Sequence, residues 1–228
     1  MTIFTFALKR TLRDRTNILF LTLFPVAAIF LPDQQYWPLL PLGYQYFGVL
    51  MLFVSIRLTS IMLDDRQKGV VKRLAAAPVS HFQYLWQNLL AFAIIMFGQN
   101  AIFIYGGSLY GHELHDPWHL LLLYTVFTFT SVSISLAWNS FYRSKESSFL
   151  VFMSVITIMA ILGGVIFPVE MLPDTFQKVA VIFPTYWFVE GIEWIVSGEN
   201  AVDLLLIYGV LMLYGTFFLI IGSVRKIG

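Results

Sequence analysis

A cluster of histidine and acidic residues at positions 112–119 holds the side chains best suited to metal chemistry. The run reads His-Glu-Leu-His-Asp-Pro-Trp-His, and imidazole and carboxylate groups are common zinc ligands. However, His115 comes one residue too early for the His-Glu-x-x-His pattern, and Pro117 argues against one continuous helix carrying all the ligands. We therefore expect no metal site here and interpret the run as a polar interfacial turn anchored by Trp118.

Other catalytic patterns are missing from the sequence. It contains no Gly-x-x-x-x-Gly-Lys-Ser/Thr phosphate loop, no Gly-x-Ser-x-Gly elbow and no cysteine. No acidic residue falls near the middle of an apolar run, where a proton- or sodium-coupled carrier usually has one. We therefore expect no catalytic residue and no enzymatic activity in this chain.

Arg57 is the one charge inside an apolar run, and we interpret it as snorkelling to the interface or pairing with a loop carboxylate, with gating or substrate binding as the alternative.

The elements that carry these residues are long and apolar. The 228 residues are 58% hydrophobic and 12% charged, and the apolar residues come in blocks long enough to cross a bilayer. We predict an all-α polytopic membrane protein with one transmembrane domain, 1–228. Its six transmembrane helices are expected at about 17–31, 42–63, 82–109, 120–142, 148–167 and 201–223. The first is short, at about 22 Å, and contains Pro25, which we expect to kink it.

Two further segments are expected at the membrane surface. Residues 2–14 form an amphipathic pattern, with Ile3, Phe4 and Ala7 on one face and Lys9 and Arg10 on the other, which predicts an N-terminal interfacial helix. Residues 168–200 are semi-apolar but broken by prolines and acids. We expect an external re-entrant segment there, made of short helices.

The charged residues are segregated along the chain. With six spans, 12 of the 14 basic residues lie on the side of the 64–80 loop, and nine of the 13 acidic residues lie on the other. The positive-inside rule makes the basic side cytoplasmic, so both termini are expected inside a bacterial cytoplasmic membrane.

Polar residues recur within the fourth predicted span. They are three or four positions apart, which places them on one helix face: Thr125, Thr128, Ser131, Ser135 and Asn139. In the third span, Asn88 and Gln99 also share a face. Bonding between helices is the expected role of these residues, and contact with a substrate is the alternative.

The 64–80 loop is polar yet internally ordered. Six of its seventeen residues are charged, whereas Val70, Val71 and Leu74 recur at helical spacing. Pro78 disfavours helix at Ala77, so a short amphipathic helix should end there. Such a helix either floats at the bilayer surface or docks into a partner.

Two stretches of the sequence resemble type-2 ABC exporter permeases. The loop is similar to the cytoplasmic coupling segment of that family, and the matching residues are Asp65, Arg66, Lys68, Gly69, Arg73, Leu74, Pro78, Val79 and Ser80. Residues 163–173 and 183–186 look like the end of the family's fifth span and its external segment, with Pro168, Glu170, Pro173, Pro184 and Tyr186 as candidate gate residues. Gln67, Lys72 and Glu193 depart from the family pattern.

The resemblance implies a permease that works as a homodimer with a separate ABC-type nucleotide-binding ATPase subunit. The coupling helix would receive force from the ATPase, and ATP and magnesium would bind there, with no cofactor on this chain. The expected partners are thus the ATPase, a second permease copy and the lipid bilayer, and not nucleic acid.

We expect the cargo to be an amphipathic drug, antimicrobial peptide or lipid. Aromatic and methionine residues on two spans are candidates for the pathway, with packing as the alternative role: Phe47, Met51, Phe149, Phe152 and Met153. The rival functions are a polysaccharide or haem-pathway exporter within the family, and a stand-alone channel or secondary transporter outside it.

Overall fold

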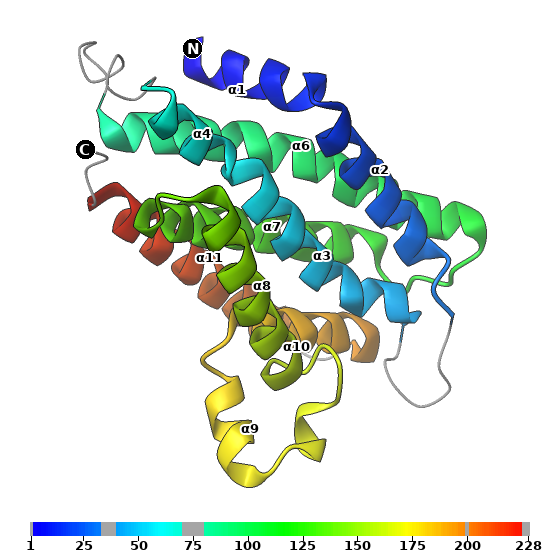
Figure 1. Ribbon diagram of the computed structural model, residues 1–228. Helices are drawn as coiled ribbons and strands as arrows, with labels where there is room; N and C mark the ends of the chain where they lie inside the picture. The colour runs from blue at the N-terminus through cyan, green and yellow to red at the C-terminus, as the bar shows by residue number, and fades with distance from the viewer. Residues whose placement is uncertain (1, 33–39, 70–79, 199–200, 225–228) are drawn as a thin grey trace.

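The chain folds into a bundle of helices. The computed structural model describes residues 2–32, 40–69, 80–198 and 201–224, and within these ranges it contains helices and no strand. In chain order the elements are α1 (Thr2–Arg13), α2 (Arg15–Ile29), α3 (Leu42–Thr59), α4 (Ile61–Gln67), α6 (His81–Tyr110), α7 (Pro117–Phe141), α8 (Lys145–Leu162), η1 (Val169–Met171), α9 (Asp174–Ala180), α10 (Pro184–Ser197) and α11 (Ala201–Val224) (Figure 1).

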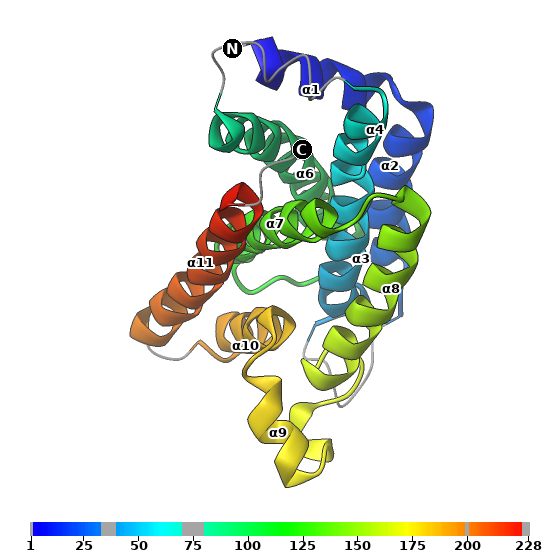
Figure 2. The ribbon, with the colours of Figure 1, turned by 60° about the vertical axis from the view of Figure 1, so that its left-hand side comes forward.

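Helix α7 lies at the centre of the bundle. It packs against α3, α6, α8, α10 and α11, and Figure 2 shows it inside the ring that these helices form. In its apolar window 78% of the residues are buried, against 22% for α8 and 28% for α11. The sequence explains this difference because α7 carries the polar stripe, whose groups need partners inside the protein, whereas α8 and α11 expose apolar residues suited to lipid.

The polar stripe on α7 joins it to its neighbours. The amide of Asn100 donates to the Thr128 hydroxyl over 2.9 Å, and the hydroxyls of Ser55 and Ser135 are 2.8 Å apart. Asn139 bridges two helices, because its amide donates to the Thr59 hydroxyl (2.9 Å) and its carbonyl accepts from the Ser148 hydroxyl (2.6 Å). For Thr128, Ser135 and Asn139 these bonds confirm the prediction that the stripe holds helices together, whereas the hydroxyls of Thr125 and Ser131 bond to carbonyls of α7 itself.

Long apolar helices occupy most of the predicted spans. Among the described residues, five helices are long and apolar enough to cross a bilayer, with α3 and α4 counted as one segment, Leu42–Gln67. The apolar helix α2 has 15 residues and falls short of that length, and it continues through Pro25. Helix α8 ends at Leu162, not near Phe167, because Gly163 and Gly164 turn the chain and Gly164 has a φ of +79°.

The segment after α8 folds as short helices. A turn of 3₁₀ helix, η1, leads to α9, and α9 and α10 meet at 89°, which is the geometry of a broken span or a re-entrant loop. Figure 1 shows α9 projecting from the bundle, whereas α10 lies against it. The ring of Phe188 on α10 fixes that contact, since its centre lies 4.5 Å from the ring centre of Phe127 and 5.2 Å from that of Tyr124, both on α7.

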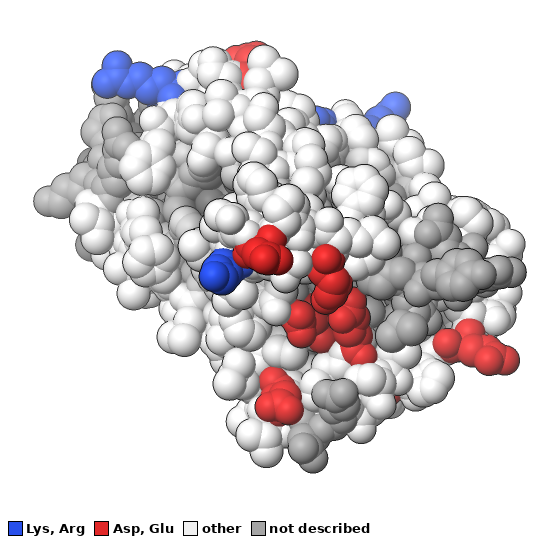
Figure 3. All heavy atoms as spheres, turned by 90° about the horizontal axis from the view of Figure 1, so that it is seen from below, with Lys and Arg blue, Asp and Glu red and all other residues white. Residues whose placement is uncertain are grey.

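The two ends of the bundle differ in charge. We call the end that holds α1, α4 and the last turn of α11 the basic end, and the end that holds η1, α9 and α10 the acidic end (Figure 1). The face around α9 shows mainly acidic side chains (Figure 3). At the basic end α1 packs along α6, where the Phe4 backbone N–H donates to the Gln87 side chain over 3.2 Å.

Candidate functional site

Four consecutive residues at the basic end each bond to a different part of the protein. We call this set, Asp64, Asp65, Arg66 and Gln67, the α4 junction. It occupies the last turn of α4, so the predicted 64–80 loop starts too early, because its first four residues continue the helix. The predicted coupling residues Asp65 and Arg66 therefore belong to the helix that continues α3, and they face partners within the chain.

Asp65 connects α4 to α1 and α6. One carboxylate oxygen lies 2.5 Å from Arg10 Nη1, and the other accepts from the Tyr84 hydroxyl over 3.2 Å. The Arg10 guanidinium also donates to the Ile61 carbonyl over 3.1 Å. Asp65 is only 7% exposed, so these charge-assisted bonds replace the water that the carboxylate loses. The sequence pattern placed Arg10 on the helix face opposite Ile3 and Ala7, and that prediction was wrong, because Arg10 turns inward to Asp65.

Arg66 connects α4 to the end of α7. Its Nη1 group lies within hydrogen-bond distance of the carbonyls of Asn139 (3.2 Å), Ser140 (3.4 Å) and Tyr142 (3.3 Å). The last carbonyls of a helix have no partner within the helix and form the negative end of its dipole. A guanidinium is well matched to this site, because it is a cation with several donors in one plane.

The outer two junction residues reach α8 and the loop before it. Lys145 Nζ lies 3.2 Å from Asp64, and the Gln67 amide donates to the Arg143 carbonyl over 3.2 Å. Both contacts are partly exposed, so each contributes less than the Asp65 contacts. Together the four residues link the end of α3 and α4 to α1, α6, α7 and α8.

The predicted coupling loop begins and ends at defined caps. Helix α4 ends where the Gly69 N–H donates to the Arg66 carbonyl over 3.0 Å, and Gly69 has a φ of +67°, which favours glycine. Ser80 is the N-cap of α6, and its hydroxyl accepts from the Gln83 N–H over 3.1 Å. The other predicted coupling residues, Arg73, Leu74, Pro78 and Val79, lie outside the described residues.

The predicted pathway residues separate into two groups. Phe47, Met51 and Phe152 are completely buried in the core, so in this structure they pack between helices and do not line an open cavity. Phe47, for example, stacks 4.1 Å from the ring of Phe103 on α6. Phe149 and Met153, on α8, are half-buried and pack at the edge of the core.

The candidate gate residues lie where the short helices of the acidic end begin. Pro168 and Pro173 immediately precede η1 and α9, and Pro184 is the first residue of α10. Glu170 is exposed, whereas Tyr186 is half-buried and hydrogen-bonds to Glu190.

Two residues that the sequence analysis missed hold the turn at the end of α8. The buried Gln45 amide, on α3, donates to the Gly164 carbonyl over 2.7 Å. From α10, the Thr185 hydroxyl donates to the Met159 carbonyl, also over 2.7 Å. This turn therefore fixes the ends of α3, α8 and α10 relative to one another.

The histidine-rich run forms no shared site in the described part of the chain. Among those residues no group of three or more histidine, aspartate or glutamate side chains is placed to hold a metal ion. Asp116 is the N-cap of α7 and accepts from the His119 N–H over 3.1 Å, and this bond lowers the pKa of the Asp116 carboxyl. His112 instead faces the Tyr44 hydroxyl at 3.2 Å.

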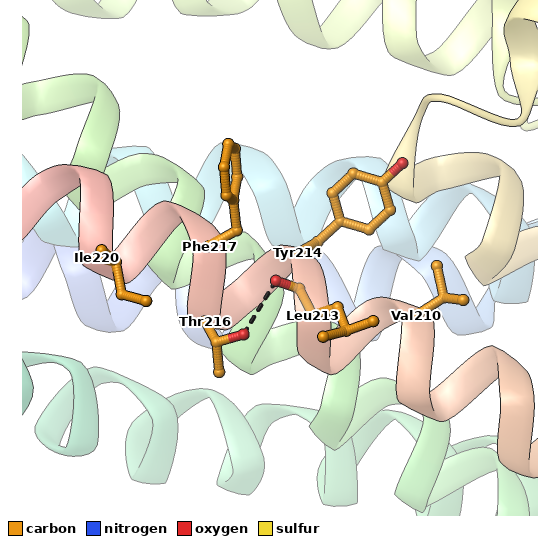
Figure 4. Close-up of a pocket in the computed structure, with 6 residues that line it drawn as sticks. All are labelled: Val210, Leu213, Tyr214, Thr216, Phe217 and Ile220. Carbon is orange, nitrogen blue, oxygen red and sulfur yellow. Dashed lines mark hydrogen bonds between the residues drawn. The ribbon is translucent and has the colours of Figure 1, made fainter.

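A depression lies on the outer face of α11, away from the α4 junction. Its volume is about 540 Å³, and its lining residues are Val210, Leu213, Tyr214, Thr216, Phe217 and Ile220 (Figure 4). Its polar groups already have partners, because the Thr216 hydroxyl bonds to carbonyls of its own helix and the Tyr214 hydroxyl donates to the Ile182 carbonyl over 2.6 Å. The depression is therefore apolar and offers no polar group to a ligand.

Comparison with known proteins gives consistent matches. The model of a family described as ABC-2 family transporter protein matches residues 35–224. Linearmycin resistance permease protein LnrN of Bacillus subtilis (strain 168) is 26% identical over 172 residues, which cover 73% of this chain and 45% of that relative. A second protein of the same organism, named "Putative transport permease YvfS", is 21% identical over 226 residues, which cover 91% of this chain and 90% of the relative. The chain thus spans about half the length of LnrN and most of YvfS.

Proposed function

Because the chain belongs to the ABC-2 transporter family and is a membrane permease, we propose that it is the translocating subunit of an ATP-driven exporter. A separate ABC-type nucleotide-binding ATPase subunit supplies the energy, which agrees with the absence of a phosphate loop in the sequence. The cargo is an amphipathic molecule: a drug, an antimicrobial peptide or a lipid. The name of one relative, linearmycin resistance permease protein, supports a role in removing such a compound.

The α4 junction is the observation that carries this proposal. A force applied to the loop after Gly69 reaches Asp64–Gln67 first, because these residues form the helical turn directly before it. From there, side-chain bonds lead to α1, α6, α7 and α8. Such a junction can convert movement of one loop into a concerted shift of several helices.

The basic end faces the cytoplasm in this proposal, as the positive-inside rule predicts, and both termini lie there. A second permease copy completes the translocation pathway. The least buried spanning helix, α8, exposes apolar side chains that a second copy can cover, among them Leu150, Val151 and Ile158. Phe149 and Met153 lie on the same helix and remain candidate pathway residues.

Reconstitution with and without the ATPase tests the proposal. We suggest purifying the permease with the ATPase whose gene neighbours its own, then measuring substrate-stimulated ATP hydrolysis and transport in proteoliposomes across amphipathic drugs, peptides and lipids. Transport should require both subunits and ATP. Transport by the permease alone would identify a channel or secondary transporter, and stimulation only by glycans or haem would favour the other exporter classes.

A further inference from the structure

Arg57 carries a positive charge in the apolar part of α3, and its side chain has no hydrogen-bond or ion-pair partner in the described part of the chain. Its guanidinium carbon lies 4.8 Å from the centre of the Phe20 ring on α2. Its Nε atom is buried and has no acceptor, and no hydrogen bond or ion pair joins the Arg57 side chain to another described residue. The predicted pairing with a loop carboxylate is therefore absent from the described residues.

The acidic residues at the basic end already have other partners. Asp65 pairs with Arg10, and Asp64 pairs with Lys145. Asp14 caps α2 through the Thr16 N–H at 2.9 Å, and Glu146 accepts from the Ser144 hydroxyl at 2.8 Å. A cation with a buried donor and no counter-charge is costly in a membrane, so an anion from outside the chain would be favoured at this position.

A connected cluster of four phenylalanine rings begins at Phe20, beside Arg57. Phe20 and Phe24 on α2 each contact Phe53 on α3, at 5.6 and 5.2 Å between ring centres, and Phe53 contacts Phe149 on α8 at 5.5 Å. All four rings are half-buried, so part of each remains accessible from the outer surface of the bundle. Figure 2 shows α2 and α8 running beside α3, the helix that carries Arg57.

Arg57 and Phe53 lie at different depths along α3. Arg57 precedes Asp64 by seven residues, which places it about 10 Å from the α4 junction along the helix. Phe53 lies one turn further, about 6 Å deeper towards the middle of the membrane. An amphiphile in the leaflet at the basic end has the same order, with its charged head near the surface and its apolar part below.

We propose that Arg57, Phe20, Phe24, Phe53 and Phe149 form a binding site for an amphiphile with a single oxyanion head, a carboxylate or a phosphate. The guanidinium pairs with the head, and the rings pack against the apolar part. As a cargo site this rests on the proposed function and narrows its substrate class to anionic amphiphiles. The same chemistry also fits an anionic membrane lipid, and the experiment separates the two sources.

Binding is measured first on the permease alone, in phosphatidylcholine nanodiscs and without the ATPase. The probes are photoactivatable twelve-carbon chains that differ in their heads: carboxylate, phosphate or trimethylammonium. The anionic probes should bind about tenfold more tightly than the cationic one and should label peptides of α2, α3 or α8, because a charge-assisted pair contributes roughly that much. Arg57→Gln should remove the preference, and Arg57→Lys should keep part of it.

Arg143→Gln is the matched control, since it removes an exposed charge at the same end of the protein. An anionic preference that survives in Arg57→Gln, or that Arg143→Gln removes equally, would overturn the proposal. So would labelling confined to other helices. These results need no ATPase and therefore do not depend on whether the exporter assignment holds.

Two further measurements identify the source of the anion. If the natural occupant is a lipid, phosphatidylglycerol nanodiscs should suppress labelling by the anionic probes. The anionic probes should then also leave ATP hydrolysis by the permease–ATPase complex unchanged. If it is cargo, the anionic probes should stimulate ATP hydrolysis in the unchanged complex but not in Arg57→Gln. Either result supports an oxyanion site at Arg57.

Discussion

The Arg10 guanidinium lies 2.5 Å from the Asp65 carboxylate and joins helices that are 55 residues apart in the sequence. The pair links α1, at the start of the chain, to the helical turn at the start of the predicted coupling segment. Because Tyr84 also donates to Asp65, one carboxylate holds three helices at the basic end.

Removal of either charge should loosen this end of the protein. We expect Arg10→Gln and Asp65→Asn each to destabilise the folded permease by about 1.5–3 kcal/mol, since each leaves a largely buried partner unpaired. The double variant should cost less than the sum of the single variants, as for any directly interacting pair. Thermal unfolding in detergent, and transport coupled to ATP hydrolysis, are the measurements. Strictly additive effects would mean that the pair does not interact.

Gly69 should be sensitive to substitution through its backbone alone. Its φ of +67° is unfavourable for residues with a side chain, yet a Cβ at this position would meet no atom within 4 Å. Gly69→Val should therefore cost about 1–2 kcal/mol in the native turn and reduce the coupling of ATP hydrolysis to transport. Gly69→Asn should cost less, because asparagine tolerates this conformation.

Gly98→Ala is the control for Gly69, because Gly98 also has open space around it but lies in regular helix. Membrane insertion should be normal in all of these variants. Pro78→Ala is expected to uncouple transport in the same way. Full coupling in both Gly69→Val and Pro78→Ala would count against a coupling role for the loop.

Much of this fold could be predicted from local pattern. Runs of apolar residues indicated the spanning helices, and the three- or four-residue spacing of polar residues placed Thr128, Ser135 and Asn139 on one face of α7. The bonds found there follow from that spacing, since one face of a helix meets one set of neighbours.

Other features depend on which helices meet, which spacing does not encode. The Arg10–Asp65 pair could not be predicted in this way, because its two residues are 55 positions apart in the sequence. Spacing likewise identified Phe47 and Met51 as apolar residues on one span, but their complete burial depends on α6 and α7. Arg57 was recognised as an isolated charge, whereas the connected cluster of four rings that begins beside it comes from three different helices.

Asn139 should stabilise the bundle more than a polar residue that bonds only within its own helix. It joins α7 to Thr59 on α3 and to Ser148 on α8, so Asn139→Ala should lower stability by about 1–2 kcal/mol, at the upper end for bonds between membrane helices. Asn88→Ala is the control, because the Asn88 amide donates to the Tyr84 carbonyl one turn earlier in α6. The comparison uses thermal unfolding in detergent, and equal losses in the two variants would contradict the bridging role.

The cap at Asp116 should weaken in acid. The His119 N–H stabilises the ionised carboxylate and lowers its pKa below the ordinary 3.8, so the stabilisation is complete above that value and is lost as the pH falls through the lowered pKa. Asp116→Asn keeps a capping oxygen that does not titrate and should remove this pH dependence. The measurement is the thermal unfolding temperature of the unchanged protein and of Asp116→Asn between pH 2 and 6. If this temperature changes equally with pH in both proteins, Asp116 makes no contribution.

The turn after α8 should tolerate almost no added volume. A Cβ on Gly163 would lie 2.0 Å from Thr185 Oγ1 and 2.6 Å from the Met159 carbonyl oxygen, so Gly163→Ala must displace Thr185 and break its bond to Met159. We expect a loss of about 1–3 kcal/mol, as for other overpacked sites, and slower transport, because this turn positions α10 at the acidic end. Thr185→Ala in the same chain removes the closest clash and should restore part of the stability. Thermal unfolding and transport of the two variants decide the point: if Gly163→Ala is as stable as the unchanged protein, α8 and α10 are not packed as closely as this structure has them.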